Sequence, residues 1–90
     1  MRYVYPAVFY QGKEAVTVYF PDLACVSQGK DYKDAFRCAK EGLSLHIFGM
    51  LEDDEKLPAP SRLESIKLSE DEALTLIEVD LKDFEPDWSI

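Results

Sequence analysis

Side chains that can act as nucleophiles or bases are scattered along this 90-residue chain. A serine hydrolase needs a base within hydrogen-bond reach of its nucleophile. The only conceivable base is the single histidine, His46, whose place beside an apolar helical stripe is more typical of a core or helix-face histidine. It would have to serve one of these serines: Ser27, Ser44, Ser61, Ser65 or Ser69.

The two cysteines, Cys25 and Cys38, are too few for a disulfide framework, and we expect reduced, structural thiols. Cys25 can in principle pair with His46, but no basic neighbour or helix N-terminus is evident that would lower its thiol pKa. A single histidine gives no metal-ligand spacing. Gly29-Lys30 lacks the Ser/Thr of a phosphate loop, and no GxGxxG is present. The sequence therefore predicts no catalytic residue, no metal and no cofactor.

Three strands are predicted before the longest helical element. Residues 3–10 are rich in Tyr, Val and Phe on both alternating faces, which indicates a central strand covered on both sides. Pro6 points the other way, because proline prefers an edge or a bulge. A turn at 11–14 leads to a strand at 15–20 whose Val16, Val18 and Phe20 share one face, and residues 24–28 form a short third strand.

A long helix is predicted over residues 32–51, with Asp31 as its N-cap. Two sets of residues recur with a period of seven. The large set should supply core contacts: Phe36, Leu43 and Met50. The small set should let the helix approach a sheet closely: Ala35, Gly42 and Gly49.

A stiff linker is predicted at Leu57-Pro58-Ala59-Pro60, after the helix ends at residues 53–55. Ser61 and Glu64 then have capping-box spacing for one short helical turn. A last strand over residues 73–81 places Glu78 and Asp80 on one face and apolar residues on the other. The elements therefore follow one another as β-β-β-α-β in a single domain.

This order predicts an α+β fold with a four-stranded sheet in the order 3-2-1-4 and one main helix on one face. A right-handed helical crossover would make the last strand parallel to the first and third strands. That arrangement is the core of a partial ribonuclease-H-like fold. Nucleases of this type hold two divalent ions with carboxylates from the first strand, the helix and the fourth strand.

The nuclease hypothesis fails on the residues available. The predicted first strand carries no acid, Glu41 can face either way on its helix, and Asp80 is expected to lack partners. Nucleic-acid recognition needs a basic face. The bases of the first half alternate with acids instead of clustering: Arg2, Lys13, Lys30, Lys33, Arg37 and Lys40.

The net negative charge is confined to one half of the chain. Beyond Met50 lie thirteen of the eighteen acids against four bases, a formal charge of −9, whereas the preceding residues carry +1. Such asymmetry repels phosphate backbones and favours a basic partner, but charge alone is more often explained by a solvated acidic face. No apolar run approaches the ~20 residues of a membrane span and no signal-peptide pattern opens the chain, so we expect a cytoplasmic location.

Six segments in order resemble the HicB-like antitoxins. They are YPAVF (5–9), VYFPDL (18–23), CVSQG (25–29), AKEGL (39–43), LPAPS (57–61) and LIEVD (76–80). The resemblance covers almost the whole chain and implies a partial ribonuclease-H-like fold, in agreement with the predicted element order. One departure is the single Ala24, where the family usually has Pro-Gly, so this loop is tighter.

The resemblance implies a non-enzymatic antitoxin that neutralises a small basic HicA-type toxin, an mRNA-cleaving ribonuclease, by protein contact. Many family members form dimers or higher oligomers and carry a C-terminal DNA-binding domain. We expect a homo-oligomer here, but no such domain and no direct DNA binding, because no basic segment follows the last strand. The alternative is a stand-alone oligomeric scaffold or ligand-binding module. The residues predicted to face the toxin are Glu52, Asp53, Asp54, Glu55, Asp80, Asp83 and Phe48.

Overall fold

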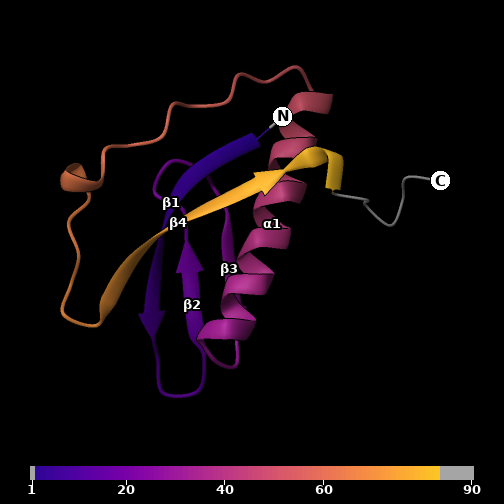
Figure 1. Cartoon of the computed structure of the whole chain (residues 1–90). Helices are drawn as coiled ribbons and strands as arrows, with labels where there is room; N and C mark the ends of the chain where they lie inside the picture. The colour runs from indigo at the N-terminus through magenta and orange to yellow at the C-terminus, as the bar shows by residue number, and fades with distance from the viewer. Residues whose placement is uncertain (1, 84–90) are drawn as a thin grey trace.

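A four-stranded sheet in the order β3-β2-β1-β4 carries one long helix on one face in the computed structural model, which describes residues 2–83 (Figure 1). The strands are β1 (Arg2–Gln11), β2 (Val16–Tyr19), β3 (Val26–Gly29) and β4 (Glu72–Asp80). The helix is α1 (Tyr32–Glu52), and two short 3₁₀ turns are η1 (Leu63–Ser65) and η2 (Leu81–Asp83). The predicted α+β class, element order, strand order and single helical face are confirmed.

The predicted direction of the last strand is wrong. β4 pairs antiparallel with β1, as β2 does with β1 and β3 with β2, so the whole sheet is antiparallel. The reason lies in the connection. α1 carries the chain roughly 31 Å along one face of the sheet. Residues 53–71 then return along the other face, so β4 starts at the end where α1 also starts (Figure 1).

The main core lies between α1 and the sheet. Alternate residues of β1, Tyr5, Ala7 and Phe9, meet Val16, Val18 and Phe20 of the second strand and its end. The helix contributes Ala35, Ala39, Leu43 and Ile47, each fully buried. Burial of one large apolar side chain contributes about 1.5–3 kcal/mol, so this layer stabilises both the sheet and the helix position.

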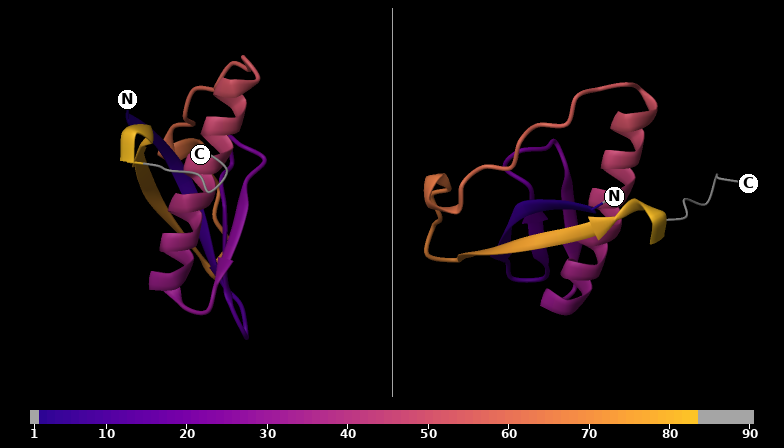
Figure 2. Two further views of the ribbon diagram at one scale, coloured as in Figure 1. Left: turned by 90° about the vertical axis from the view of Figure 1, so that its right-hand side faces the viewer. Right: turned by 45° about the horizontal axis from the view of Figure 1, so that its top comes forward.

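The opposite face of β1 is also buried, at Pro6 and Val8. Residues 53–71 pass over this face of the sheet, which therefore lies between α1 and this segment (Figures 1 and 2). β1 is thus a central strand, as its composition predicts. Pro6 fits there because the β1–β2 pairing extends only from Val8 to Gln11, so Pro6 lies opposite Leu76 of β4 alone.

Helix α1 begins as predicted, with the Asp31 carboxylate accepting from the Asp34 N–H at 2.8 Å. Its small-residue face is only partly as predicted. A Cβ at Gly42 would lie 2.9 Å from Ser27 Oγ, which marks a close approach to β3, whereas a Cβ at Gly49 would meet nothing within 4 Å. Phe36 is not a core residue: it remains 39% exposed and stacks on Phe9 at a ring distance of 6.4 Å.

The predicted capping box at Ser61 and Glu64 is wrong. A short turn does form at η1, but its N-cap is Arg62 and no side chain caps it. Ser61 instead binds across the molecule: its N–H donates to Asp22 Oδ2 at 2.9 Å, and its hydroxyl donates to the other oxygen of the same carboxylate. Asp22 therefore fixes the linker to the turn between β2 and β3. Between residues 2 and 83, no helix combines the length and apolarity that a membrane crossing needs.

Candidate partner-binding surface

Four consecutive acids form the C-terminal end of α1. Glu52 is the last helical residue, Asp53 is the C-cap, and Asp54 and Glu55 follow; all four are exposed. We call these residues, 52–55, the acidic helix end. The last helical turn contains no base, and no described base lies within ion-pair distance of the four carboxylates. Because a helix C-terminus carries partial negative charge, acids there are electrostatically unfavourable.

The backbone of the acidic helix end is fixed in spite of this repulsion. The Asp53 N–H bonds the Gly49 carbonyl at 3.1 Å, and the Glu55 N–H bonds the Met50 carbonyl at 2.8 Å. Asp54 has φ of 56°, a left-handed conformation that no other non-glycine residue in the described chain adopts. The acids are therefore held at defined positions and not on a frayed end.

Asp80 lies apart from the acidic helix end, at the end of β4. Arg2 Nε lies 4.0 Å from Asp80 Oδ2, and the Lys82 N–H donates to Oδ1 at 3.1 Å. The hydrogen bond from Lys82 is the main cause that lowers the Asp80 pKa. Asp83 belongs to η2, and its side chain is outside the described part; Phe48 is half-buried on α1.

A cavity of about 340 Å³ separates α1 from the end of β4. We call it the α1–β4 cavity. Seven residues line it: Arg2, Lys40, Glu41, Ser44, Glu78, Val79 and Asp80. Sequence analysis missed Glu78 as a site residue, although its alternation with Asp80 on one strand face was a usable signal. It also left the direction of Glu41 open, and the structure brings Glu41 and Asp80 to one cavity.

A ribonuclease-H-like site would require carboxylates from the first strand, the helix and the last strand, and these three elements line the α1–β4 cavity. The first strand contributes Arg2, a cation, to this place. No three Cys, His, Asp or Glu side chains converge on a possible metal position anywhere in residues 2–83. The arrangement is suited to salt bridges with another charged group, since acids and bases both line it.

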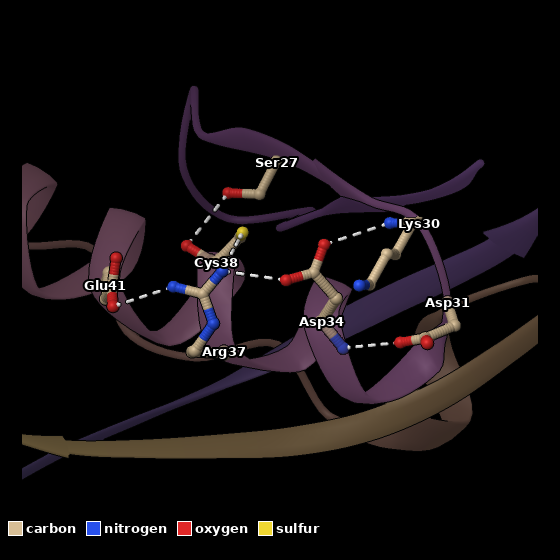
Figure 3. A network of polar contacts seen from close by, with 7 residues as sticks. All are labelled: Ser27, Lys30, Asp31, Asp34, Arg37, Cys38 and Glu41. Atoms are coloured by element: carbon tan, nitrogen blue, oxygen red, sulfur yellow. Dashed lines mark hydrogen bonds and ion pairs between the residues drawn. The ribbon is translucent and has the colours of Figure 1, made fainter.

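The Arg37 guanidinium near the start of α1 is bound by two carboxylates (Figure 3). Arg37 donates to Asp34 Oδ1 at 2.7 Å and to Glu41 Oε1 at 3.2 Å. The hydrogen bond from Arg37 lowers the Asp34 pKa, helped by the Lys30 N–H, and the same contact raises the Arg37 pKa. The charge of Arg37 is therefore balanced within the helix, which supports the interpretation of this face as a solvated face and not as a phosphate-binding patch.

The candidate nucleophiles have structural partners. Cys25 is buried, and burial raises the pKa of its thiol, so it is poorly suited to nucleophilic attack. Cys38 is also a free thiol. The Ser27 hydroxyl donates to the Cys38 carbonyl at 3.4 Å, and the Ser44 hydroxyl donates to the Lys40 carbonyl at 3.0 Å. His46 is half-buried on α1.

Comparison with known proteins gives consistent results. Residues 5–88 match the model of the HicB_like antitoxin of bacterial toxin-antitoxin system. An uncharacterized 14.9 kDa protein from the rep-hol intergenic region of Haemophilus phage HP1 is 39% identical over 82 residues, which cover 87% of this chain. The chain spans 62% of the length of that phage relative.

Two solved structures share the fold. One is a toxin-antitoxin complex from Streptococcus pneumoniae, with a TM-score of 0.85 and 24% identity over 97% of this chain and 75% of the other. The second is the HicA3 and HicB3 toxin-antitoxin complex, with a TM-score of 0.66 and 25% identity over 87% of this chain and 99% of the other.

The fold and the sequence match define a domain of the bacterial toxin-antitoxin class. The chain belongs to the HicB-like antitoxin family.

Proposed function

We propose that this protein is an antitoxin that binds and neutralises a small basic HicA-type mRNA-cleaving toxin by protein-protein contact, without catalysis. Family membership supports the toxin-antitoxin role. The observation that carries the proposal is the acidic helix end, in which four exposed acids stand at the negative pole of α1 without a neutralising base. The repulsion between these acids and the helix C-terminus lowers the stability of the free chain, and a basic partner that binds there offsets this loss.

The charge of the partner follows from its chemistry. A ribonuclease must attract RNA phosphates and therefore presents a basic surface. A fixed set of carboxylates can occupy that surface and accelerate association through complementary fields. We place Glu52, Asp53, Asp54 and Glu55 at the contact, with Asp80, Asp83 and Phe48 as further contributors.

The proposal is tested by co-expressing the chain with the basic protein encoded beside its gene and measuring the association rate of the purified partners. The rate should fall steeply between low and physiological ionic strength, because exposed charges are screened over ~8–10 Å. Replacing Asp53, Asp54 and Glu55 by Ser should slow association and weaken neutralisation. The matched control removes three exposed acids from the linker, Glu64, Glu70 and Asp71, and should leave the rate close to that of the wild type.

If the association rate is independent of salt, the apolar surface near Phe48 becomes the better candidate for the toxin contact. A failure of the two proteins to form any complex would favour the alternative, an oligomeric scaffold or ligand-binding module. Catalysis is checked in parallel: RNA incubated with the pure chain and Mg²⁺ or Mn²⁺ should stay intact. Divalent-dependent cleavage that disappears in Asp80→Asn would contradict the non-enzymatic role.

A further inference from the structure

The outer edge of β4 is open. In the order β3-β2-β1-β4 this strand ends the sheet, and among residues 2–83 no strand pairs with its far side. In Figure 1 this edge faces the viewer, with no helix or strand in front of it. β4 has nine residues, about 30 Å of extended backbone, and its pairing with β1 runs without a bulge from Asp80 to Glu72. It contains no Pro or Gly.

Such an edge is normally protected by short length, proline, a bulge or charge. β4 has only charge, and its charge has one sign: Glu72 at the start, and Glu78 and Asp80 at the end, with no base between them. Glu78 is exposed and has no ion-pair partner in the described chain. Between these acids lies Leu76, which is 51% exposed. The edge therefore has an apolar centre and acidic ends.

A second copy of this chain fits this edge poorly. Two β4 strands paired antiparallel about Leu76 would place Glu72 opposite Asp80 at both ends, and like charges directly opposite each other are destabilising. An extended strand with apolar residues in its middle and Lys or Arg towards its ends has the complementary pattern. The charge pattern therefore selects a basic strand of another protein.

The α1–β4 cavity adds a second, independent feature at the same edge. It opens between α1 and the last residues of β4, and its lining contains three carboxylates, Glu41, Glu78 and Asp80, and two bases, Arg2 and Lys40. Glu41 is already bound by Arg37. Its volume of about 340 Å³ corresponds to roughly ten water molecules at ~30 Å³ each, which is enough for one long basic side chain. The Asp80 side chain is only 16% exposed and is engaged by Arg2 and by the Lys82 N–H, whereas Glu78 is exposed, so Glu78 is the carboxylate that an incoming cation meets first.

We propose that the outer edge of β4 accepts an extended basic strand of the partner protein, which continues the sheet and places one Lys or Arg side chain in the α1–β4 cavity. Main-chain hydrogen bonds give such an added strand its affinity, and side-chain pockets give it specificity. The inference rests on the proposed function, because it identifies the partner as the basic toxin. It goes further by assigning the mode of binding and a second contact surface.

Amide hydrogen exchange of the whole chain, alone and in complex with the toxin encoded beside its gene, tests this mode directly. In the free chain, β4 amides that point away from β1 should exchange quickly. In the complex they should become protected at least tenfold, because they donate to the added strand. Glu78→Lys should weaken toxin binding at least tenfold, whereas Glu64→Lys, an equal charge reversal in the linker, should change it less than twofold. Thermal unfolding of both variants shows whether they are folded.

The outcomes separate the two proposals. A complex in which β4 amides stay unprotected, or in which both charge reversals weaken binding equally, overturns the strand addition and leaves the antitoxin role intact. The absence of any complex overturns both. Protection of β4 together with selective weakening by Glu78→Lys supports the inference.

Discussion

Tyr5 connects the sheet core to the linker. Its ring lies in the core between β1 and α1, and its hydroxyl donates to the Pro58 carbonyl at 2.5 Å. Burial is the main cause that raises the pKa of this phenol above its usual 10.0, with a further contribution from Asp22. Asp22 also holds Ser61, so two adjacent contacts attach the linker to the sheet.

We predict that Tyr5→Phe lowers the free energy of unfolding by about 0.5–1.5 kcal/mol at neutral pH, through loss of one hydrogen bond. The pKa shift gives a second effect. The pKa of Tyr5 is higher in the folded chain than in the unfolded chain. The stability that the neutral phenol contributes is therefore complete below pH 10 and is lost as the pH rises further. Tyr5→Phe should therefore flatten the alkaline decline, as measured by urea unfolding from pH 7 to 11.

The matched control is Tyr10→Phe, since Tyr10 is 43% exposed at the end of the same strand. It should change stability by less than ~0.5 kcal/mol. An unchanged alkaline decline in Tyr5→Phe would show that other groups cause it.

Single residues also show where sequence patterns lose information. Gly42 and Gly49 have the same seven-residue spacing, yet only Gly42 faces a close neighbour, Ser27 of β3. The helix is much longer than strand β3, so Gly49 lies beyond the part of the helix that packs on this strand. The seven-residue spacing in the sequence gives no information about the length of β3. The same holds for Phe36, which stacks on Phe9 and remains partly exposed.

At the scale of elements, the end of α1 combines an unfavourable charge with an unfavourable backbone conformation. Asp54 has a φ of 56°, whereas Asp53 has a φ of −90°. A left-handed residue with a side chain is less stable than glycine at the same position. The end of α1 is therefore a place where substitution or partner binding can increase stability, and it is also where we place the partner contact.

We predict that Asp54→Gly raises the free energy of unfolding by about 0.5–1 kcal/mol while slowing toxin association. Asp53→Gly is the control: it removes the same charge at a position with negative φ, and it should be less stable than Asp54→Gly. Urea unfolding of the two variants isolates the backbone effect. Equal stability in both would show that the left-handed conformation carries no cost here.

At the scale of the whole molecule, the chain order and the strand alternation predicted most of the fold. The alternation of Val16 and Val18 with Thr17 is reproduced in their burial, and β1 is central. The direction of β4 was not predictable from local patterns, because it depends on how far the linker travels. The α1–β4 cavity was not predictable either, because it forms between two elements, α1 and β4, whose relative position depends on the path of the linker.

We predict that the protein self-associates through the outer side of α1. Leu45 and Leu51 are each 42% exposed there, and half-buried Phe48 lies between them at helical spacing. Light scattering at micromolar concentration should give a mass above the 10.3 kDa of one chain. Leu45→Glu should lower that mass, whereas Leu63→Glu, at an equally exposed linker leucine, should not. A monomer mass for the wild type would contradict this prediction.

The pairing of β1 with β4 joins the first described strand to the last, with Arg2 opposite Asp80. During synthesis at roughly 5–20 residues per second, β1 therefore waits several seconds for the strand that completes its second edge. Until then β1 has β2 alone as a strand neighbour, and Pro6 is not covered by Leu76. The newly made chain passes through an interval in which its most apolar strand is open to chaperones, to proteases and to any partner that is already present.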